Sequence, residues 1–546
     1  MARSPLLRAL QALAREHQEA SSLGVDVEDL HERRLEGRLS RRELLKRGGI
    51  AGAAVALGGP AAVARAAGSS LQASGAPRIA IVGGGIAGLS AALTLQDKGV
   101  AADVYESSGR VGGRMHSDWQ EGAAFANYWG GQQAELCGEL IDSNHKTILQ
   151  LAQRFGIQTV DLLQAQPNGT EDTYSIFGSD YPFSQASADF KPVHNTLQGQ
   201  VQATSYPTLY RQFTSAGQFF DQMTLYDWIT NYVPGGHSSQ LGALLNAAYN
   251  EEYGAETTDQ SALNLIYLLG YKAGPGTWSI YGASDERYHI VGGNSKLPVT
   301  MAGALARPVN FGYRMTSIAL ASDGSINVWF DNGRTVNADH VILCMHFAVL
   351  RTLNYKKANF DQLKQTAITQ LGAGVNSKLI LQFNSRLWNA YGSTGSLYSD
   401  QSFQSAWEVS RGQSGSTGLL VEYPGAAQSR SMAQSRSYST TATNPNVAKF
   451  AQQFLAQLEP IFPGLTNQWN GKAMLSTPAT DPNFNCSYSY WKPGQYVGFS
   501  GYEKMRQGNI HFAGEHCSVD FQGFMEGGAA EGVRAATEIL GDIKAL

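Results

Sequence analysis

A glycine-rich turn between a short apolar strand and a helix constrains the fold of this chain most strongly. Residues 79–82 read Ile-Ala-Ile-Val, and the turn follows with the spacing Gly83-x-Gly85-x-x-Gly88. The apolar run predicts a buried strand, and residues 86–98 predict a helix whose N-terminal amides are free. Because such amides can bind a pyrophosphate, we expect a Rossmann-type dinucleotide site here.

An acidic residue ends the next predicted strand, at residues 102–106. This residue, Glu106, lies 18 positions after Gly88. A carboxylate at this position can accept hydrogen bonds from both ribose hydroxyls and would repel a 2′-phosphate. The pattern therefore favours FAD or NAD over NADP.

Composition limits the classes of function. At 546 residues the chain is long enough for two domains, and a formal net charge of −4 does not suggest a nucleic-acid partner. The four cysteines, Cys137, Cys344, Cys486 and Cys517, are scattered and form no metal-ligand spacing. We therefore predict neither a disulfide framework nor a metal site, although one disulfide pair stays open for an exported protein.

The N-terminal region carries an arginine pair, Arg41-Arg42, then an apolar run at residues 48–63 and an A-x-A pattern at residues 64–66. This resembles a twin-arginine signal, so residues 1–66 are predicted to be a leader for export to the periplasm or the medium. The alternative is a basic helical turn followed by an alanine-rich linker. The run of 16 residues is shorter than the roughly 20 of a membrane helix, and no later segment qualifies, so no membrane span is predicted.

Residues 109–114, Gly-Arg-Val-Gly-Gly-Arg, follow Glu106 almost directly. With this segment the chain resembles the flavin amine oxidase family, which includes monoamine, polyamine and L-amino acid oxidases. The resemblance implies FAD as the cofactor and places Arg114 beside its pyrophosphate.

Three later segments extend the resemblance. Residues 135–142 look like the family's second glycine segment, whose backbone lies along the flavin, although Cys137 replaces a usual glycine. Residues 289–298 look like the return from the substrate domain. Apolar and polar residues alternate along residues 314–343, as they do in the strands of the family's second dinucleotide sheet. Met315 matches the position whose backbone contacts adenine.

The C-terminal region resembles the family's closing motif. Residues 509–516 predict a buried strand that ends at Glu515, and residues 523–532 open an alanine-rich helix. The resemblance places Glu515 at the ribityl chain of FAD. It places the backbone of Met525 at the flavin pyrimidine, where the positive helix end stabilises negative charge on reduction.

The predicted fold is α/β, of the two-domain α+β kind. A Rossmann-like FAD-binding domain (residues 77–150, 285–355 and 476–546) carries an inserted, discontinuous substrate domain of mixed sheet and helices (151–284 and 356–475), with helices expected at 223–231, 240–249 and 261–269. The predicted cofactor contacts are Gly83, Gly85, Ile86, Ala87, Gly88, Glu106, Ser107, Gly113, Arg114, Gly138, Glu139, Leu140, Met315, Gly514, Glu515, Gly523, Phe524 and Met525.

A single lysine, Lys378, interrupts the apolar strand predicted at residues 372–383. A buried lysine is costly unless it has a polar partner. The segment resembles the family strand whose lysine holds a water against flavin N5 and is implicated in reoxidation by oxygen. The alternative is an edge-strand lysine that reaches solvent.

An aromatic pair, Tyr488 and Phe524, matches the family's two rings that flank the amine in front of the flavin. The alternative is that both rings belong to the core. Some monoamine oxidases bind FAD through a cysteine in this segment, and the alignment places either Ser487 or Cys486 at that position. We predict non-covalent FAD.

The resemblance implies an oxidase that transfers hydride from the α-carbon of a primary amine or an L-amino acid to flavin N5. Oxygen then takes the electrons from the reduced flavin and becomes hydrogen peroxide, and the imine hydrolyses to a carbonyl product and ammonia. Leu140 stands where snake-venom-type L-amino acid oxidases carry a carboxylate-binding arginine; Arg287, Arg386 or Arg411 could serve instead. The alternatives are a dehydrogenase or desaturase that passes electrons to an acceptor other than oxygen, and a non-catalytic flavin-binding protein. The sequence is also compatible with a homodimer.

Overall fold

The computed structural model describes residues 77–270 and 279–543. The predicted leader, residues 1–66, lies outside the described residues. Residues 77–546 form one compact unit, so the predicted domain boundaries inside it stay a prediction.

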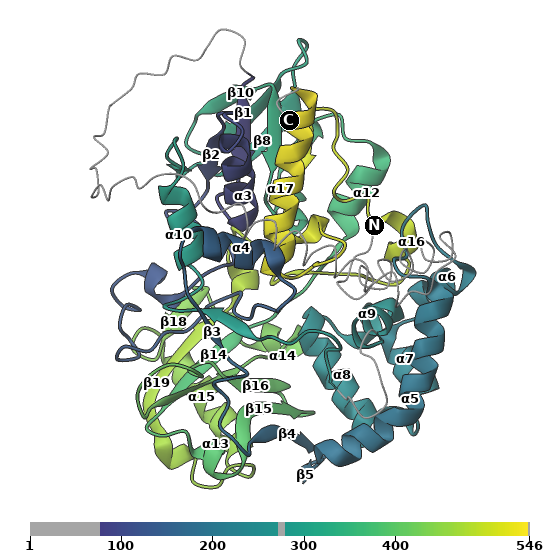
Figure 1. The fold of residues 1–546 in the computed structure, drawn as a ribbon, viewed down its shortest axis with the longest axis vertical. Coiled ribbons are helices and arrows are strands. Elements are labelled where there is room, and N and C mark those ends of the chain that lie inside the picture. Colours follow the sequence, from purple (N-terminus) through teal and green to yellow (C-terminus); the bar gives the residue numbers. More distant parts are fainter. Residues whose placement is uncertain (1–76, 271–278, 544–546) are drawn as a thin grey trace, which may run out of the picture. The chain divides into compact units, whose positions relative to one another are not determined.

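A five-stranded parallel sheet contains the glycine-rich turn. Its strand order is β21 (Ile510–Phe512), β11 (His340–Leu343), β1 (Ile79–Val82), β2 (Asp103–Glu106) and β7 (Asn310–Phe311). The central strand β1 is fully buried, as its apolar sequence predicts. The helices α3 (Ile86–Gln96) and α17 (Met525–Asp542) pack together against one face of the sheet, and Figure 1 shows them side by side.

Close packing explains the glycine at position 88. A Cβ atom on Gly88 would lie 1.9 Å from the carbonyl oxygen of Gly83, inside any allowed contact. Gly83 itself has φ +115°, which disfavours a side chain there. The predicted strand, turn and helix are therefore confirmed, with α3 ending at Gln96 rather than at residue 98.

A second sheet covers the other face of the parallel sheet, with the strand order β10 (Thr335–Ala338), β9 (Ile326–Phe330), β8 (Met315–Leu320) and β12 (Asn354–Lys357). Of the predicted segment 338–343, Ala338 belongs to this sheet, but the prediction was wrong for residues 340–343. Residues 340–343 form β11, which pairs in parallel with β1 and β21. All four residues of β11 are buried, which suits an interior parallel strand rather than a half-exposed antiparallel one.

The largest sheet has eight strands: β18 (Tyr438–Thr440), β19 (Trp469–Ser476), β14 (Lys378–Phe383), β17 (Gly418–Glu422), β16 (Ser405–Glu408), β15 (Ser393–Ser399), β4 (Glu171–Ile176) and β5 (Ser179–Asp180). Helix α15 (Pro445–Leu458) packs on one of its faces. Because β14 lies between β17 and β19, Lys378 is not on an edge strand, and that alternative was wrong.

A group of helices packs beside this sheet: α5 (Phe183–Thr204), α6 (Ser215–Gln222), α7 (Leu225–Tyr232), α8 (Gln240–Tyr253) and α9 (Ala262–Leu269). The three predicted helices are confirmed as α7, α8 and α9. Their starts are set by side-chain caps, since Thr224, Ser239 and Ser261 each accept a hydrogen bond from a first-turn amide.

The remaining helices and strands connect these layers. They are α4 (Lys146–Arg154), α10 (Lys296–Gly303), α11 (Phe347–Leu350), α12 (Gln362–Gln370), α13 (Leu387–Ala390), α14 (Ala426–Ser431) and α16 (Gln495–Phe499), and the strand pairs β3 (Thr159–Asp161) with β6 (Tyr288–Ile290) and β13 (Gly372–Ala373) with β20 (Ser489–Tyr490). Among the described residues, none of the helices has the length and apolar character of a membrane span.

Candidate active site

One cavity of about 830 Å³ runs from the turn after β1 to the eight-stranded sheet. All but one of the predicted site residues line it: Gly83, Gly85, Ile86, Ala87, Glu106, Ser107, Gly113, Arg114, Gly138, Glu139, Leu140, Met315, Lys378, Tyr488, Gly514, Glu515, Gly523, Phe524 and Met525. Gly88 is the exception, because it packs beneath the turn. The structure thus brings together residues separated by up to 442 positions in the sequence.

At one end of the cavity, no side chain of the described residues caps the first-turn amides of α3. Its N-cap residue, Gly85, has no side chain to satisfy them, and the first turn carries no acidic residue. Ile86 and Ala87 line the cavity, and Gly113 approaches Gly85 so closely that a Cβ atom on Gly113 would lie 3.3 Å from the Gly85 Cα atom. Free donors beside a wall of bare backbone fit a pyrophosphate.

Glu106 is held rigidly at the end of β2. Its Oε2 atom accepts a hydrogen bond from the Gly84 amide at 2.7 Å, and its Oε1 atom accepts from the Ser108 amide at 2.8 Å and from the Ser107 hydroxyl at 3.2 Å. Met315 lines the same cavity. The carboxylate therefore has a fixed position at the nucleotide end.

Arg114 and Glu515 form an ion pair in the cavity wall. The Arg114 Nη1 atom donates to Glu515 Oε1 at 3.0 Å and to the Ser487 carbonyl at 2.8 Å. Glu515 also accepts from the Gly523 amide at 2.8 Å and from the Ser489 hydroxyl at 3.1 Å. Since Glu515 is 5% exposed, it joins three separate segments in a water-poor setting.

The N-terminus of α17 opens onto the cavity through Met525. Its N-cap residue, Phe524, provides no side-chain cap, and the first-turn acid, Glu526, instead accepts from the amides of Thr147 and Ile148 at 2.9 Å each. A Cβ atom on Gly138 would lie 3.1 Å from the Met525 side chain, so that segment approaches the helix closely. The positive helix end is thus not neutralised by its own side chains.

Lys378 is buried against a carboxylate rather than exposed. Its Nζ atom lies 2.6 Å from Glu139 Oε2, and the side chain of Trp407 donates to Glu139 Oε1 at 3.0 Å. Lys378 is 4% exposed and Glu139 is 8% exposed. The polar partner that a buried lysine requires is therefore Glu139, which sequence reasoning had assigned only to cofactor contact.

The two predicted aromatic residues both reach the cavity, each with its own neighbours. The Tyr488 hydroxyl lies 3.2 Å from the Tyr423 hydroxyl and donates to the Glu251 carbonyl at 3.3 Å. The ring of Phe524 packs edge-on against His145, with 5.2 Å between centroids. Tyr423 and Trp407 also line the cavity and were not predicted, because no motif marks them.

Cys486 lies outside the residues that line the cavity, whereas Ser487 is one of them. The Cys486 Sγ atom is fully buried, 3.3 Å from His346 Nδ1. Burial raises the pKa of this thiol to about 12, so it is not a reactive thiolate. None of the four cysteines, which all lie in the described part of the chain, forms a disulfide bond.

The three arginines named as carboxylate partners differ in position. Arg287 pairs with Asp161 at 2.7 Å, and Arg386 pairs with Glu408 at 2.6 Å. Arg411 alone among them lines the cavity, and its Nε atom is buried without a hydrogen-bond partner in the described part of the chain.

Four of the acidic residues that line the cavity are Asp172, Glu251, Glu252 and Glu286. Burial raises the pKa of Glu251 to about 8, and burial together with Asp142 and Glu251 raises the pKa of Glu286 to about 8. Glu251 accepts from the Tyr281 hydroxyl at 2.5 Å. The carboxylates of Glu252 and Glu286 have no hydrogen-bond partner among the described residues, and sequence reasoning identified none of the four.

Comparison with known proteins agrees with this geometry. The family described as flavin containing amine oxidoreductase matches residues 86–540. A flavin-containing amine oxidase of Oncorhynchus mykiss is 21% identical over 85% of each chain, and a putative L-amino-acid oxidase, YobN, of Bacillus subtilis is 24% identical over 86% of this chain and 96% of that one.

The fold is also that of solved structures. Cyclohexylamine oxidase from Brevibacterium oxydans superposes with a TM-score of 0.72 at 19% identity, over 86% of this chain and 100% of the other. A putrescine oxidase bound to putrescine gives a TM-score of 0.69 at 16% identity, over 85% and 99%. The predicted α/β fold is thus confirmed. The chain therefore belongs to the flavin-containing amine oxidoreductase family, and its cofactor is FAD.

Proposed function

We propose that this protein is an FAD-dependent oxidase that deaminates a primary amine with oxygen as the acceptor. Bound FAD supplies a two-electron acceptor for the hydride of the amine α-carbon, while the nitrogen lone pair forms the C=N bond. Two electrons and two protons passed to oxygen give hydrogen peroxide, and water hydrolyses the imine to a carbonyl product and ammonia.

The chain's own residues hold and orient the reactants. The amides of α3 and the Arg114–Glu515 pair bind the pyrophosphate and ribityl parts of FAD, without a covalent bond. The uncapped end of α17 favours negative charge at the pyrimidine, and the ring of Tyr488 orients the amine and excludes water. Lys378, fixed by Glu139, holds the water that serves the oxygen step.

The observation that carries the substrate proposal is the acidic end of the cavity. Glu251, Glu252, Glu286 and Asp172 all line this cavity, and the charge of Arg411 acts on Asp172. An apolar monoamine would leave the carboxyl groups of Glu252 and Glu286 without a partner among the described residues, whereas a second ammonium group would provide one. We therefore propose a diamine or polyamine substrate.

A second candidate follows from Arg411. Its buried, unpartnered Nε atom could bind a substrate carboxylate, which would make the substrate an L-amino acid with a cationic side chain. Such a molecule would use Arg411 and the acidic residues together.

Matched substrate pairs test these proposals. Under anaerobic conditions, flavin bleaching is followed with butane-1,4-diamine against butylamine, and with L-lysine against L-norleucine. We expect the second cationic group to raise the rate of flavin reduction at least tenfold at low substrate concentration. Equal rates within each pair would contradict the proposed substrate class but not the proposed oxidase activity.

The same experiment separates the rival functions. Bleaching followed by slow return of colour in air would indicate a dehydrogenase or desaturase with another acceptor. A bound flavin that no amine or amino acid bleaches would indicate a non-catalytic flavin-binding protein.

We further propose that residues 1–66 direct twin-arginine export, on the basis of Arg41-Arg42 and the A-x-A pattern at residues 64–66. Replacing both arginines by lysine should retain the protein in the cytoplasm. Unchanged export of that variant would contradict the proposal.

A further inference from the structure

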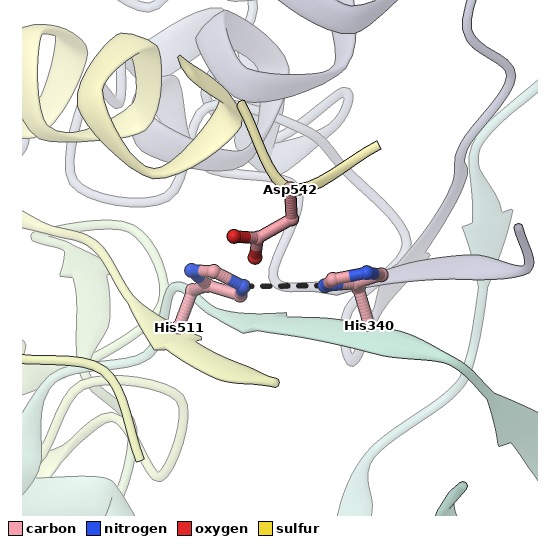
Figure 2. Close-up of side chains that lie close together, drawn as sticks. All are labelled: His340, His511 and Asp542. Carbon is pink, nitrogen blue, oxygen red and sulfur yellow. Dashed lines mark hydrogen bonds between the residues drawn. The ribbon is translucent and has the colours of Figure 1, made fainter. Parts of the chain in front are cut away.

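We propose a second functional group in this protein: a binding site for a divalent transition metal of the Zn²⁺ class, formed by His340, His511 and Asp542. One ligand atom of each residue lies within 4.8 Å of those of the other two. Figure 2 shows the two rings facing one another, with the Asp542 carboxylate beside them.

The site lies away from the flavin cavity. His340 begins β11, and Asp542 is the last residue of α17. The first residue of α17, Met525, lines the cavity, and 18 helical residues span about 27 Å. The three residues therefore have no part in the amine chemistry.

The distance between the two histidine rings suits coordination of one metal ion better than a direct hydrogen bond between the rings. The His340 Nδ1 atom lies 3.4 Å from His511 Nε2, which is long for an N–H···N hydrogen bond. Two imidazole nitrogens that each lie about 2.0–2.1 Å from a tetrahedral Zn²⁺ are separated by roughly 3.3–3.4 Å. The rings are thus already spaced as two ligands of one ion.

The surroundings of His511 prepare its Nε2 atom for coordination. Its Nδ1 atom lies 2.8 Å from Glu538 Oε2, and Glu538 is held in turn by Arg534 at 2.5 Å. A proton on Nδ1 that is donated to Glu538 leaves the Nε2 lone pair directed at His340. A carboxylate that orients a histidine in this way is the usual outer partner of a metal-bound imidazole.

The other two residues can each direct a ligand atom to the same point. His340 is 7% exposed, and its Nδ1 atom faces Nε2 of His511. Asp542 pairs with Arg506 through Oδ2, so its second oxygen is available. The Asp542 side chain is 29% exposed, which gives an ion access from solvent, and water would complete the tetrahedron.

The sequence did not predict this site, because its ligands have no short, motif-like spacing. His340 and His511 are 171 residues apart and meet only because β11 and β21 are neighbours. A metal bound here would join the parallel sheet to the C-terminal end of α17, so its effect should be on stability rather than on turnover.

Zn²⁺ and Co²⁺ titrations of the metal-free, untagged holoenzyme test the proposal. We expect one Zn²⁺ per chain by calorimetry, the visible absorption bands of a four-coordinate Co²⁺ site, and a higher Tm with Zn²⁺. His511→Ala and the surface variant Asp542→Asn should each weaken binding at least tenfold, while a partly exposed histidine elsewhere, in His237→Ala, provides the matched control.

Retention of the flavin spectrum confirms that each variant is folded. Absence of stoichiometric binding to the wild-type chain would overturn the proposal and leave a simple contact between two neutral rings. Unchanged binding by the folded Asp542→Asn and His511→Ala variants would overturn it equally.

Discussion

The Nζ atom of Lys378 lies 2.6 Å from Oε2 of Glu139, and both side chains are buried at the flavin cavity. Taking two charges out of water costs several kcal/mol per ion, so a pair in this position is poor evidence for a purely stabilising role. The burial of the pair beside Trp407 and Tyr423 instead suits a group that is held in place for chemistry.

Replacement of Lys378 by methionine should slow reoxidation more than flavin reduction. The substitution keeps the length of the side chain and removes the charged donor. We expect reoxidation by oxygen to fall at least tenfold, or about 1.4 kcal/mol in activation free energy, with flavin reduction changed less than threefold. Stopped-flow measurement of the two half-reactions checks this, with Lys356→Met on β12 as the control; an unchanged oxygen step would remove the assigned role.

Replacement of Glu286 by glutamine should erase the preference for a second cationic group. The substitution keeps the shape of the side chain and removes a carboxyl group that can ionise when a cation binds beside it. We expect kcat/KM for butane-1,4-diamine to fall about 10- to 100-fold, or roughly 1.4–2.8 kcal/mol, while that for butylamine is maintained. A parallel loss for both substrates would show that Glu286 is structural.

The stability of the substrate-free holoenzyme should fall as the pH rises toward 8. The pKa of Glu286 is raised by burial, Asp142 and Glu251 to about 8 in the folded chain, above its value of roughly 4.3 when unfolded. The folded state therefore binds more protons between these values, and the contribution of this group is lost as the pH passes the folded pKa.

Tm measured by flavin fluorescence from pH 5 to pH 9 checks this prediction. Glu286→Gln should show a weaker decline, whereas the exposed Glu171→Gln should follow the wild type. The same decline in all three proteins would refute the assignment to Glu286.

Replacement of Gly88 by alanine should prevent assembly of the nucleotide site. The added Cβ atom would meet the Gly83 carbonyl at 1.9 Å and force β1 and α3 apart. We expect little soluble protein and several-fold lower flavin content, whereas Gly109→Ala, where a Cβ atom meets nothing within 4 Å, should bind FAD normally. Absorbance of the purified variants measures this, and normal flavin content in Gly88→Ala would contradict the packing argument.

The sequence indicates how the residues at the nucleotide end of the site are arranged, but it does not indicate the arrangement at the substrate end. Gly83, Gly88 and Glu106 lie within one local unit, so spacing alone indicates their arrangement. Glu251 and Glu286 come from α8 and from the loop before β6, and only the tertiary fold brings them together. No periodicity in either segment distinguishes a cavity acid from a surface acid.

The assignment of residues 340–343 to the wrong sheet has a similar cause. Their apolar run is compatible with either sheet, and the choice depends on parallel pairing with β1 and β21, whose paired residues lie 261 and 169 positions away. Long-range pairing of this kind leaves no local signal in the sequence.

The most direct test of the central claim is a stoichiometric anaerobic titration of the purified yellow protein with an amine, followed by admission of air. The account predicts one FAD per chain, complete bleaching by one equivalent of a suitable diamine, and one equivalent of hydrogen peroxide as the colour returns. A purified protein without bound flavin, or a flavin that no amine or amino acid reduces, would contradict it.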